Sequence, residues 1–186
     1  MTKKYTLNQH LTNLNQNSRA TQVEIFKLRN RISKAFIDCG YEEASKDNDL
    51  IDEYINMIFE TQNYRCTFWL RVGKDQLNGL WNAPYRDYMG WKSETIWYEL
   101  DHVNPVNNGG TDDLENYQFL SANANRFTKC SLTHDDLLRR IDLSDKLKRR
   151  LRTVVKRRKK LFKSEKWKLF KQKMEESKFC NTSEEK

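Results

Sequence analysis

The apolar positions in the first third of the chain predict two amphipathic helices. Between Ser18, a suitable helix cap, and Gly40, a common stop signal, apolar residues recur at the spacing of one helix face. These positions are Ile25, Leu28, Ile32, Ala35, Phe36 and Cys39. A second helix is expected to begin at Asp47 or Asp49, and its apolar stripe consists of Ile51, Tyr54, Ile55, Ile58 and Phe59. The polar, Asn-rich start of the chain is expected to be loosely docked.

The pattern in the middle of the chain changes from helical to strand-like. Residues 64–72 (YRCTFWLRV) are rich in aromatic and β-branched side chains and predict a strand. Residues 73–90 contain Asn-Gly and Ala-Pro pairs and predict a loop. A second strand is predicted over residues 95–103, a short return strand over 117–120 and a helix over 121–130. This order of strand, loop, strand and helix is a ββα unit.

The last part of the chain combines helical periodicity with positive charge. After a short helical stretch capped by Thr133, the residues from Ser144 onward predict one long helix or two successive helices. Their apolar seam consists of Leu147, Leu151, Val154, Val155, Trp167, Phe170 and Met174. A basic helix with such a seam docks by the seam and presents its Lys and Arg side chains outward.

The charge of the chain is distributed unevenly. The segment Lys146–Lys173 contains fifteen basic residues and one acid, Glu165, so it carries +14 in a chain whose total is +8. This asymmetry is typical of a polyanion-binding arm attached to a neutral or acidic body. We therefore predict that the segment binds nucleic-acid phosphates. The residues selected for this role are Arg149, Arg150, Arg152, Lys156, Arg157, Arg158, Lys159 and Lys160.

Composition excludes several other classes of protein. The negative mean hydropathy and the lack of a long apolar run argue against a transmembrane helix. The first ten residues lack the apolar region of a secretory signal, so no membrane association and a cytoplasmic location are expected. The four cysteines are scattered without a C-x-x-C pair, which argues against a zinc knuckle or a disulfide scaffold. The Lys- and Asn-rich composition fits an AT-rich genome, such as that of a phage.

Residues 97–129 contain the side chains best suited to catalysis. His102 suits a general base, because the ordinary pKa of histidine, about 6.5, lies near operating pH. Neighbouring strand residues point to opposite faces, but at a bent strand end Asp101 and His102 can flank one ion. Asn125, in the predicted helix, can share that metal with Asp101 when the hairpin brings the helix back. A carboxylate and an amide oxygen favour a hard cation such as Mg²⁺, with Mn²⁺ as the alternative.

The motif formed by LDHVNPVNNGGTDDLEN and the later Asn125 resembles the HNH nuclease motif of the ββα-metal superfamily. The resemblance covers residues 99–129. It implies that His102 activates water, that Asp101 and Asn125 hold one divalent metal, and that Asn116 braces the loop and the general base. Cleavage would leave 5′-phosphate and 3′-hydroxyl ends.

The chain differs from many members of that family in one feature. Those members bind structural zinc through C-x-x-C pairs around the hairpin, and this chain lacks such pairs. Ser121 and Ala124 stand at the positions of the second pair, and only Cys66 remains of a first pair. The chain therefore resembles zinc-free HNH domains, including those within RNA-guided CRISPR effector nucleases. Structural zinc is not expected.

The expected protein is an α+β, metal-dependent HNH endonuclease acting on double-stranded DNA. Its parts would be an N-terminal helical region (residues 1–62), a ββα-metal hairpin–helix core (63–142) and a basic C-terminal helical arm and tail (143–186). Two alternatives stay open: a catalytically inactive DNA-binding protein, and a ribonuclease.

Several residues near or outside the motif have weaker expected roles. Arg126 and Lys129, beside Asn125, are expected either to hold the scissile phosphate or to form a solvated helix face. Glu99, two residues before Asp101, is expected either to lie near the metal or, as the favoured alternative, to be an exposed strand acid. His10 and His134 fall outside the motif and are expected on the surface.

Overall fold

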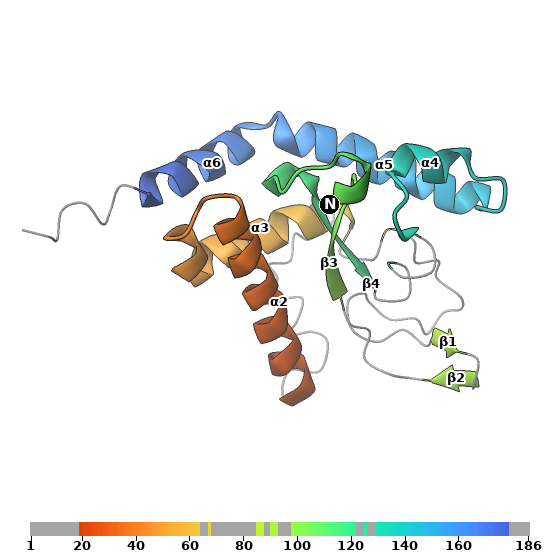
Figure 1. Ribbon diagram of the computed structural model, residues 1–186, viewed down its shortest axis with the longest axis horizontal. Coiled ribbons are helices and arrows are strands. Elements are labelled where there is room, and N and C mark those ends of the chain that lie inside the picture. Colours follow the sequence, from red (N-terminus) through yellow and green to blue (C-terminus); the bar gives the residue numbers. More distant parts are fainter. Residues whose placement is uncertain are drawn as a thin grey trace, which may run out of the picture.

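The computed structural model describes residues 19–63, 67, 85–87, 90–92, 98–121, 125 and 129–178 of the chain. The described elements combine helices with short antiparallel hairpins, so the fold is α+β (Figure 1). Residues 1–17 lie outside the described residues, and so does the predicted strand at 64–72 except for Thr67.

The two N-terminal helices are confirmed with nearly the predicted bounds. Helix α2 is Arg19–Asp38 and helix α3 is Asn48–Thr61. The chain turns after α2 at Gly40, whose φ is 82°. Asp47 caps α3, because its carboxylate accepts hydrogen bonds from the backbone N–H groups at the start of the helix. These bounds were predictable because periodicity and caps are local properties.

The basic end of the chain forms two successive helices. Helix α5 is Asp145–Phe162 and helix α6 is Glu165–Ser177, and both begin at a serine whose hydroxyl accepts a backbone hydrogen bond. The second cap, at Ser164, separates the two helices. The shorter helix α4, His134–Arg139, precedes them and begins with a capping box at Thr133.

Helix α6 packs on the N-terminal helices through aromatic rings. The ring of Trp167 lies 5.3 Å from that of Phe170, which in turn stacks on Tyr54 at 6.0 Å. At the rim of this contact, the ammonium of Lys173 lies 2.8 Å from the Glu53 carboxylate. The C-terminal segment therefore shares one hydrophobic core with the N-terminal helices.

The hairpin that carries the motif lies among these helices (Figure 1). Strand β3 is Tyr98–His102 and strand β4 is Tyr117–Ser121, paired antiparallel with His102 opposite Tyr117. The ring of Phe119 stacks on Phe59 of α3 with 4.3 Å between centroids. The Gln62 side chain donates to the Phe119 carbonyl at 2.6 Å and accepts from its N–H at 3.0 Å. These contacts fix the end of α3 to β4.

A second hairpin lies in the region predicted as loop. Strands β1, Tyr85–Asp87, and β2, Gly90–Lys92, pair antiparallel. The loop predicted over residues 73–90 was wrong at Tyr85–Asp87 and Gly90, because strands of three residues are too short to show an alternating pattern. In the part of the chain that the structure covers, no helix is both long and apolar enough to cross a membrane.

Trp167→Ala is expected to lower the free energy of unfolding by about 3–5 kcal/mol, because it leaves a cavity between α3 and α6. Trp167 is 1% exposed. Urea denaturation followed by circular dichroism measures the change. Leu169→Ala is the control, because Leu169 lies on the same helix and is 52% exposed, so its loss should cost well under 1 kcal/mol. Equal effects of both variants would contradict this packing.

Candidate active site on the β3–β4 hairpin

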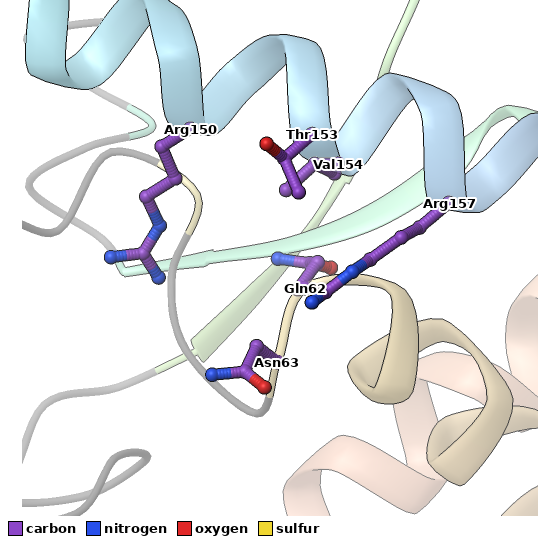
Figure 2. A pocket seen from close by; sticks show the side chains of 6 residues that line it. All are labelled: Gln62, Asn63, Arg150, Thr153, Val154 and Arg157. Atoms are coloured by element: carbon purple, nitrogen blue, oxygen red, sulfur yellow. The ribbon is translucent and has the colours of Figure 1, made fainter.

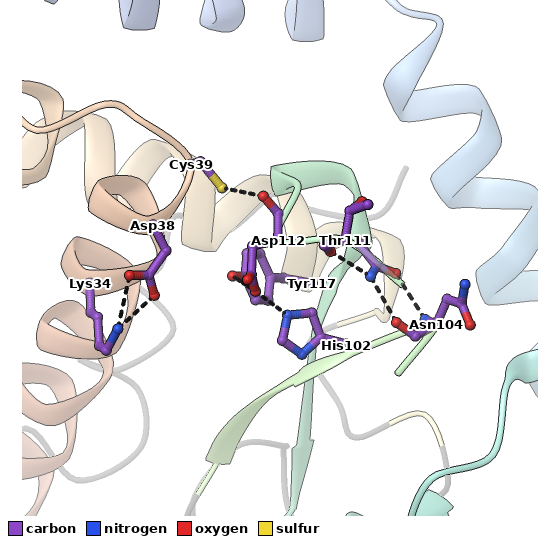
Figure 3. Close-up of polar contacts among 9 residues, drawn as sticks. Lys34, Asp38, Cys39, His102, Asn104, Thr111, Asp112 and Tyr117 are labelled. Carbon is purple, nitrogen blue, oxygen red and sulfur yellow. Dashed lines mark hydrogen bonds and ion pairs between the residues drawn. The ribbon is translucent and has the colours of Figure 1, made fainter. Parts of the chain in front are cut away.

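The loop between β3 and β4 is closed by the side chain of Asn116, whose partners Asn104 and Thr111 are labelled in Figure 3. Its Nδ2 donates to the carbonyls of Asn104 and Thr111 at 2.8 and 2.9 Å, and its Oδ1 accepts from the Asn104 N–H at 2.8 Å. Gly110 allows this closure, because a Cβ there would lie 1.9 Å from the Asn104 carbonyl oxygen. Asn116 thus has the geometry that loop bracing requires.

His102 lies beside two loop and strand residues that hold its ring. Its Nε2 is 2.8 Å from Oδ1 of Asp112, and its ring packs against Tyr117 with 4.7 Å between centroids. The Tyr117 hydroxyl donates to the same carboxylate oxygen at 3.1 Å. Hydrogen bonds from His102 and Tyr117 lower the pKa of Asp112. Since an ionised carboxylate only accepts, Nε2 carries the proton and Nδ1 can accept one.

Asp112 was not singled out from the sequence. It lies ten residues after His102 in a loop, where no periodicity predicts which side chain will face the histidine. In the folded loop, which the Asn116 contacts close, Asp112 lies beside the histidine. The adjacent acids Asp112 and Asp113 were the only local signal, and Asp113 instead caps the 3₁₀ turn Leu114–Asn116.

Asp101 lies on the opposite face of β3 from His102. Its Oδ2 accepts from the side-chain amide of Gln118, its partner across the hairpin, at 3.0 Å. The Lys129 ammonium lies 3.4 Å from the same oxygen. Burial raises the pKa of Asp101, although Lys129 opposes this shift, and burial lowers the pKa of Lys129. Asp101 and His102 therefore have separate sets of partners on the two faces of β3, and their flanking of one ion stays a prediction.

Lys129 does not lie where a phosphate outside the protein can reach it. Its side chain is 0% exposed, and its Nζ has no hydrogen-bond partner among the described residues beyond the ion pair with Asp101. The Lys129 ammonium is buried against Asp101. The expected role of Lys129 in holding the scissile phosphate therefore does not fit the structure. Arg126 lies outside the described residues.

His134 is buried, so the expected surface position was wrong. Its Nε2 lies 3.0 Å from Oε1 of Gln118. Since the amide nitrogen of Gln118 donates to Asp101, the oxygen must accept, and His134 is the donor. Burial lowers the pKa of His134 to about 3, so the ring is neutral. The result is a buried chain of hydrogen bonds from His134 through Gln118 to Asp101.

Asn125 contacts Glu99, which lies on the same face of β3 as Asp101. The Asn125 Nδ2 donates to Oε2 of Glu99 at 3.0 Å. The Asn125 carbonyl accepts from the Cys130 N–H at 2.7 Å, a π-type contact over five residues. Glu99 is half-buried and paired, so it is not the exposed acid that was expected. The contact between Glu99 and Asn125 could not be predicted from sequence patterns, because the two residues are 26 positions apart.

The side chains of this face fit a hard cation by their donor chemistry. Two carboxylates, of Glu99 and Asp101, and the amide of Asn125 lie on one face of the hairpin, and oxygen donors of this kind suit Mg²⁺. Burial disfavours the charged form of Asp101, a cost that a cation offsets. The described residues contain no group of three His, Cys, Asp or Glu side chains that could hold a metal ion.

The eight α5 residues predicted to bind phosphate divide into an exposed or half-buried group and one buried residue. The exposed members are Arg149, Arg152, Lys156, Arg157, Lys159 and Lys160, and Arg150 is half-buried. Arg158 is buried and donates to the Glu115 carbonyl at 2.6 Å, and burial lowers its pKa to about 10. The expected phosphate contact of Arg158 is therefore wrong, because this side chain anchors α5 to the β3–β4 loop.

Comparisons with models of protein families, with curated proteins and with solved structures found no match to this chain.

Replacing His134 by Gln is expected to flatten the pH dependence of stability in acid. The folded wild-type protein keeps His134 neutral down to about pH 3, whereas the unfolded chain binds a proton below its ordinary pKa of 6.5. Wild-type stability should therefore fall as pH drops from 6.5, by up to about 1.4 kcal/mol per pH unit from this residue. Urea titrations at several pH values measure this slope. Parallel curves for the two proteins would contradict a neutral, buried His134.

Proposed function

We propose that the protein is a metal-dependent endonuclease of the HNH type that hydrolyses DNA phosphodiester bonds. One observation carries the proposal: adjacent residues of β3 present a paired histidine and an oxygen-rich cluster. His102 is paired with Asp112, while Asp101 shares its face with Glu99 and Asn125. A part-exposed histidine on the same strand as acidic and amide side chains supports phosphodiester hydrolysis, which needs both a base and a positive centre.

The proposed base is His102. Asp112 holds the ring through Nε2 and favours the imidazolium that forms when Nδ1 takes a proton from water. Tyr117 packs against the ring and limits its rotation. Although Asp101 points to the other face, its Cα is only about 3.8 Å from that of His102, so a phosphate at the end of β3 can contact both faces.

The proposed metal ligands are Asp101 and Asn125, with Glu99 beside them. Bound there, Mg²⁺ or Mn²⁺ would supply positive charge for the departing 3′ oxygen. Gln118 orients the Asp101 carboxylate toward this face. The buried amine of Lys129 adds positive charge at the same carboxylate.

The proposed substrate is double-stranded DNA. The exposed Lys and Arg side chains of α5 support binding to backbone phosphates that is mainly independent of sequence and weakens with salt. By resemblance to the family, the products carry 5′-phosphate and 3′-hydroxyl ends.

A nucleic-acid-binding protein without catalysis is the second candidate. It is favoured by the ion pair between Lys129 and Asp101, which already balances the charge of one proposed ligand. A plasmid-nicking assay separates the two candidates, since only the nuclease converts supercoiled DNA to nicked or linear forms. The same assay with an RNA substrate tests ribonuclease activity.

His102→Ala is expected to lower the rate of plasmid cleavage by about 10²–10⁴-fold, because it removes the general base. DNA affinity should be unchanged, since the proposed phosphate contacts are made by the exposed Lys and Arg side chains of α5. Lys46→Ala is a control that removes an exposed cation whose ion-pair partner is Glu43, outside the hairpin, and it should cut at the wild-type rate. Wild-type cleavage by His102→Ala would exclude the proposed role.

Removal of divalent metal with EDTA is expected to abolish cleavage, and added Mg²⁺ or Mn²⁺ should restore it. Asp101→Asn keeps the side-chain size but removes a charged ligand, so it should raise the Mg²⁺ concentration needed for half-maximal cleavage by about tenfold or more. A titration of cleavage rate against Mg²⁺ measures this. An unchanged midpoint would exclude Asp101 as a ligand.

A further inference from the structure

A polar pocket of about 260 Å³ lies between α5 and the end of α3 (Figure 2). It is lined by Gln62, Asn63, Arg150, Thr153, Val154 and Arg157. Neither His102 nor the Asp101 cluster contributes to it, so it is separate from the candidate active site. We refer to it as the Arg150–Arg157 pocket.

Two arginines converge on this pocket because of their helical spacing. Arg150, Thr153 and Arg157 follow one another at three and four residues, which places them on one face of α5. Figure 2 shows both arginine side chains extending from α5 toward the end of α3. The described residues that line the pocket include no acid. Arg150 makes a further interaction within the protein, and together with Arg157 it brings positive charge to one concave site, which attracts an anion.

The opposite wall of the pocket is held rigidly. Gln62 is 1% exposed, and its amide forms two hydrogen bonds with the backbone of Phe119 in β4. The next residue, Asn63, has a φ of 55°, a left-handed conformation that asparagine tolerates better than most residues. Its N–H donates to the Glu60 carbonyl at 3.1 Å, which closes the helix end. The exposed Asn63 side chain is thereby placed at the pocket, opposite the arginines (Figure 2).

The size and chemistry of the pocket select a small anion. Pockets for drug-sized ligands typically measure about 300–1,000 Å³ and have mostly apolar or aromatic walls. This pocket is smaller, and Val154 is its one apolar lining residue among those described. Guanidinium groups match phosphate oxygens through paired N–H donors, and amide and hydroxyl groups supply further donors.

We propose that the Arg150–Arg157 pocket binds one backbone phosphate of the nucleic-acid strand and so sets the position of the substrate on the protein. This inference rests on the proposed function in taking nucleic acid as the bound polyanion. The pocket and the candidate active site share strand β4, because Phe119 holds Gln62 and the preceding residue, Gln118, holds Asp101. A phosphate anchored in the pocket therefore keeps a constant offset from the hairpin.

The test compares two double variants that lose the same charge from the same helix. The pocket variant, Arg150→Gln with Arg157→Gln, removes both arginines that line the pocket. The control variant, Arg149→Gln with Arg152→Gln, removes two exposed arginines that do not line it. Affinity for a short fluorescent DNA duplex is measured by anisotropy in EDTA over a series of salt concentrations. The pocket variant should lose at least about tenfold more affinity than the control. Its log–log salt slope should fall by about 0.9 for each lost phosphate contact.

Asn63→Gly provides a test that leaves net charge unchanged. Glycine accepts the left-handed backbone at this position, so the helix end is kept while the amide donor is lost. This variant should bind the duplex at least about threefold more weakly, since a hydrogen bond to a charged group is lost. Equal losses in the two double variants, or wild-type binding by Asn63→Gly, would overturn the proposal.

The outcome is distinguishable from that of the proposed function. Binding is measured in EDTA, where the expected metal-dependent cleavage does not occur, so a protein that fails to cut plasmid can still show the pocket effect. Conversely, plasmid cleavage together with equal losses of duplex affinity in the two double variants would support the proposed function and contradict phosphate binding in the pocket.

Discussion

Residues 117–120 of β4 are buried on both faces of the strand, so the polar groups packed against them need partners within the protein. Gln118 meets this requirement on one face, where it links His134 to Asp101. On the other face, Asp112 receives hydrogen bonds from the His102 ring and the Tyr117 hydroxyl. Both proposed catalytic groups are thus oriented by contacts that also stabilise the fold, and the strand alternation divides them between two environments.

The same constraint joins the basic helix to the hairpin. Arg158 donates to the Glu115 carbonyl, and the Trp167 indole donates to the Glu115 carboxylate at 2.8 Å, so α5 and α6 are both fixed to one 3₁₀ turn before β4. These two contacts connect α5 and α6 to the hairpin, so in the proposed nuclease a nucleic-acid strand bound to α5 would keep a defined position relative to β4. In the proposed nuclease, affinity and chemistry belong to one rigid unit and not to a body with a projecting arm.

Much of the secondary structure and the loop chemistry was predictable, because these features depend on neighbouring residues. The limits of α2 and α3 follow from apolar periodicity with Asp47 and Gly40 as boundary signals. Gly110 is required by the approach of the Asn104 carbonyl, a short-range contact within one loop. The side chains that were misjudged, Lys129 and His134 among them, lie where burial depends on distant elements.

The sequence by itself determined which side chains are available for chemistry, how the helices are capped and where the positive charge lies. Only the tertiary structure decided which groups meet: Asp112 with His102, Glu99 with Asn125, and Arg158 with the loop instead of solvent. The physical reason is that a motif specifies local backbone geometry, whereas desolvation and partner choice arise when segments far apart in the chain pack together. For a polar residue, these two effects decide between a surface role and an internal one.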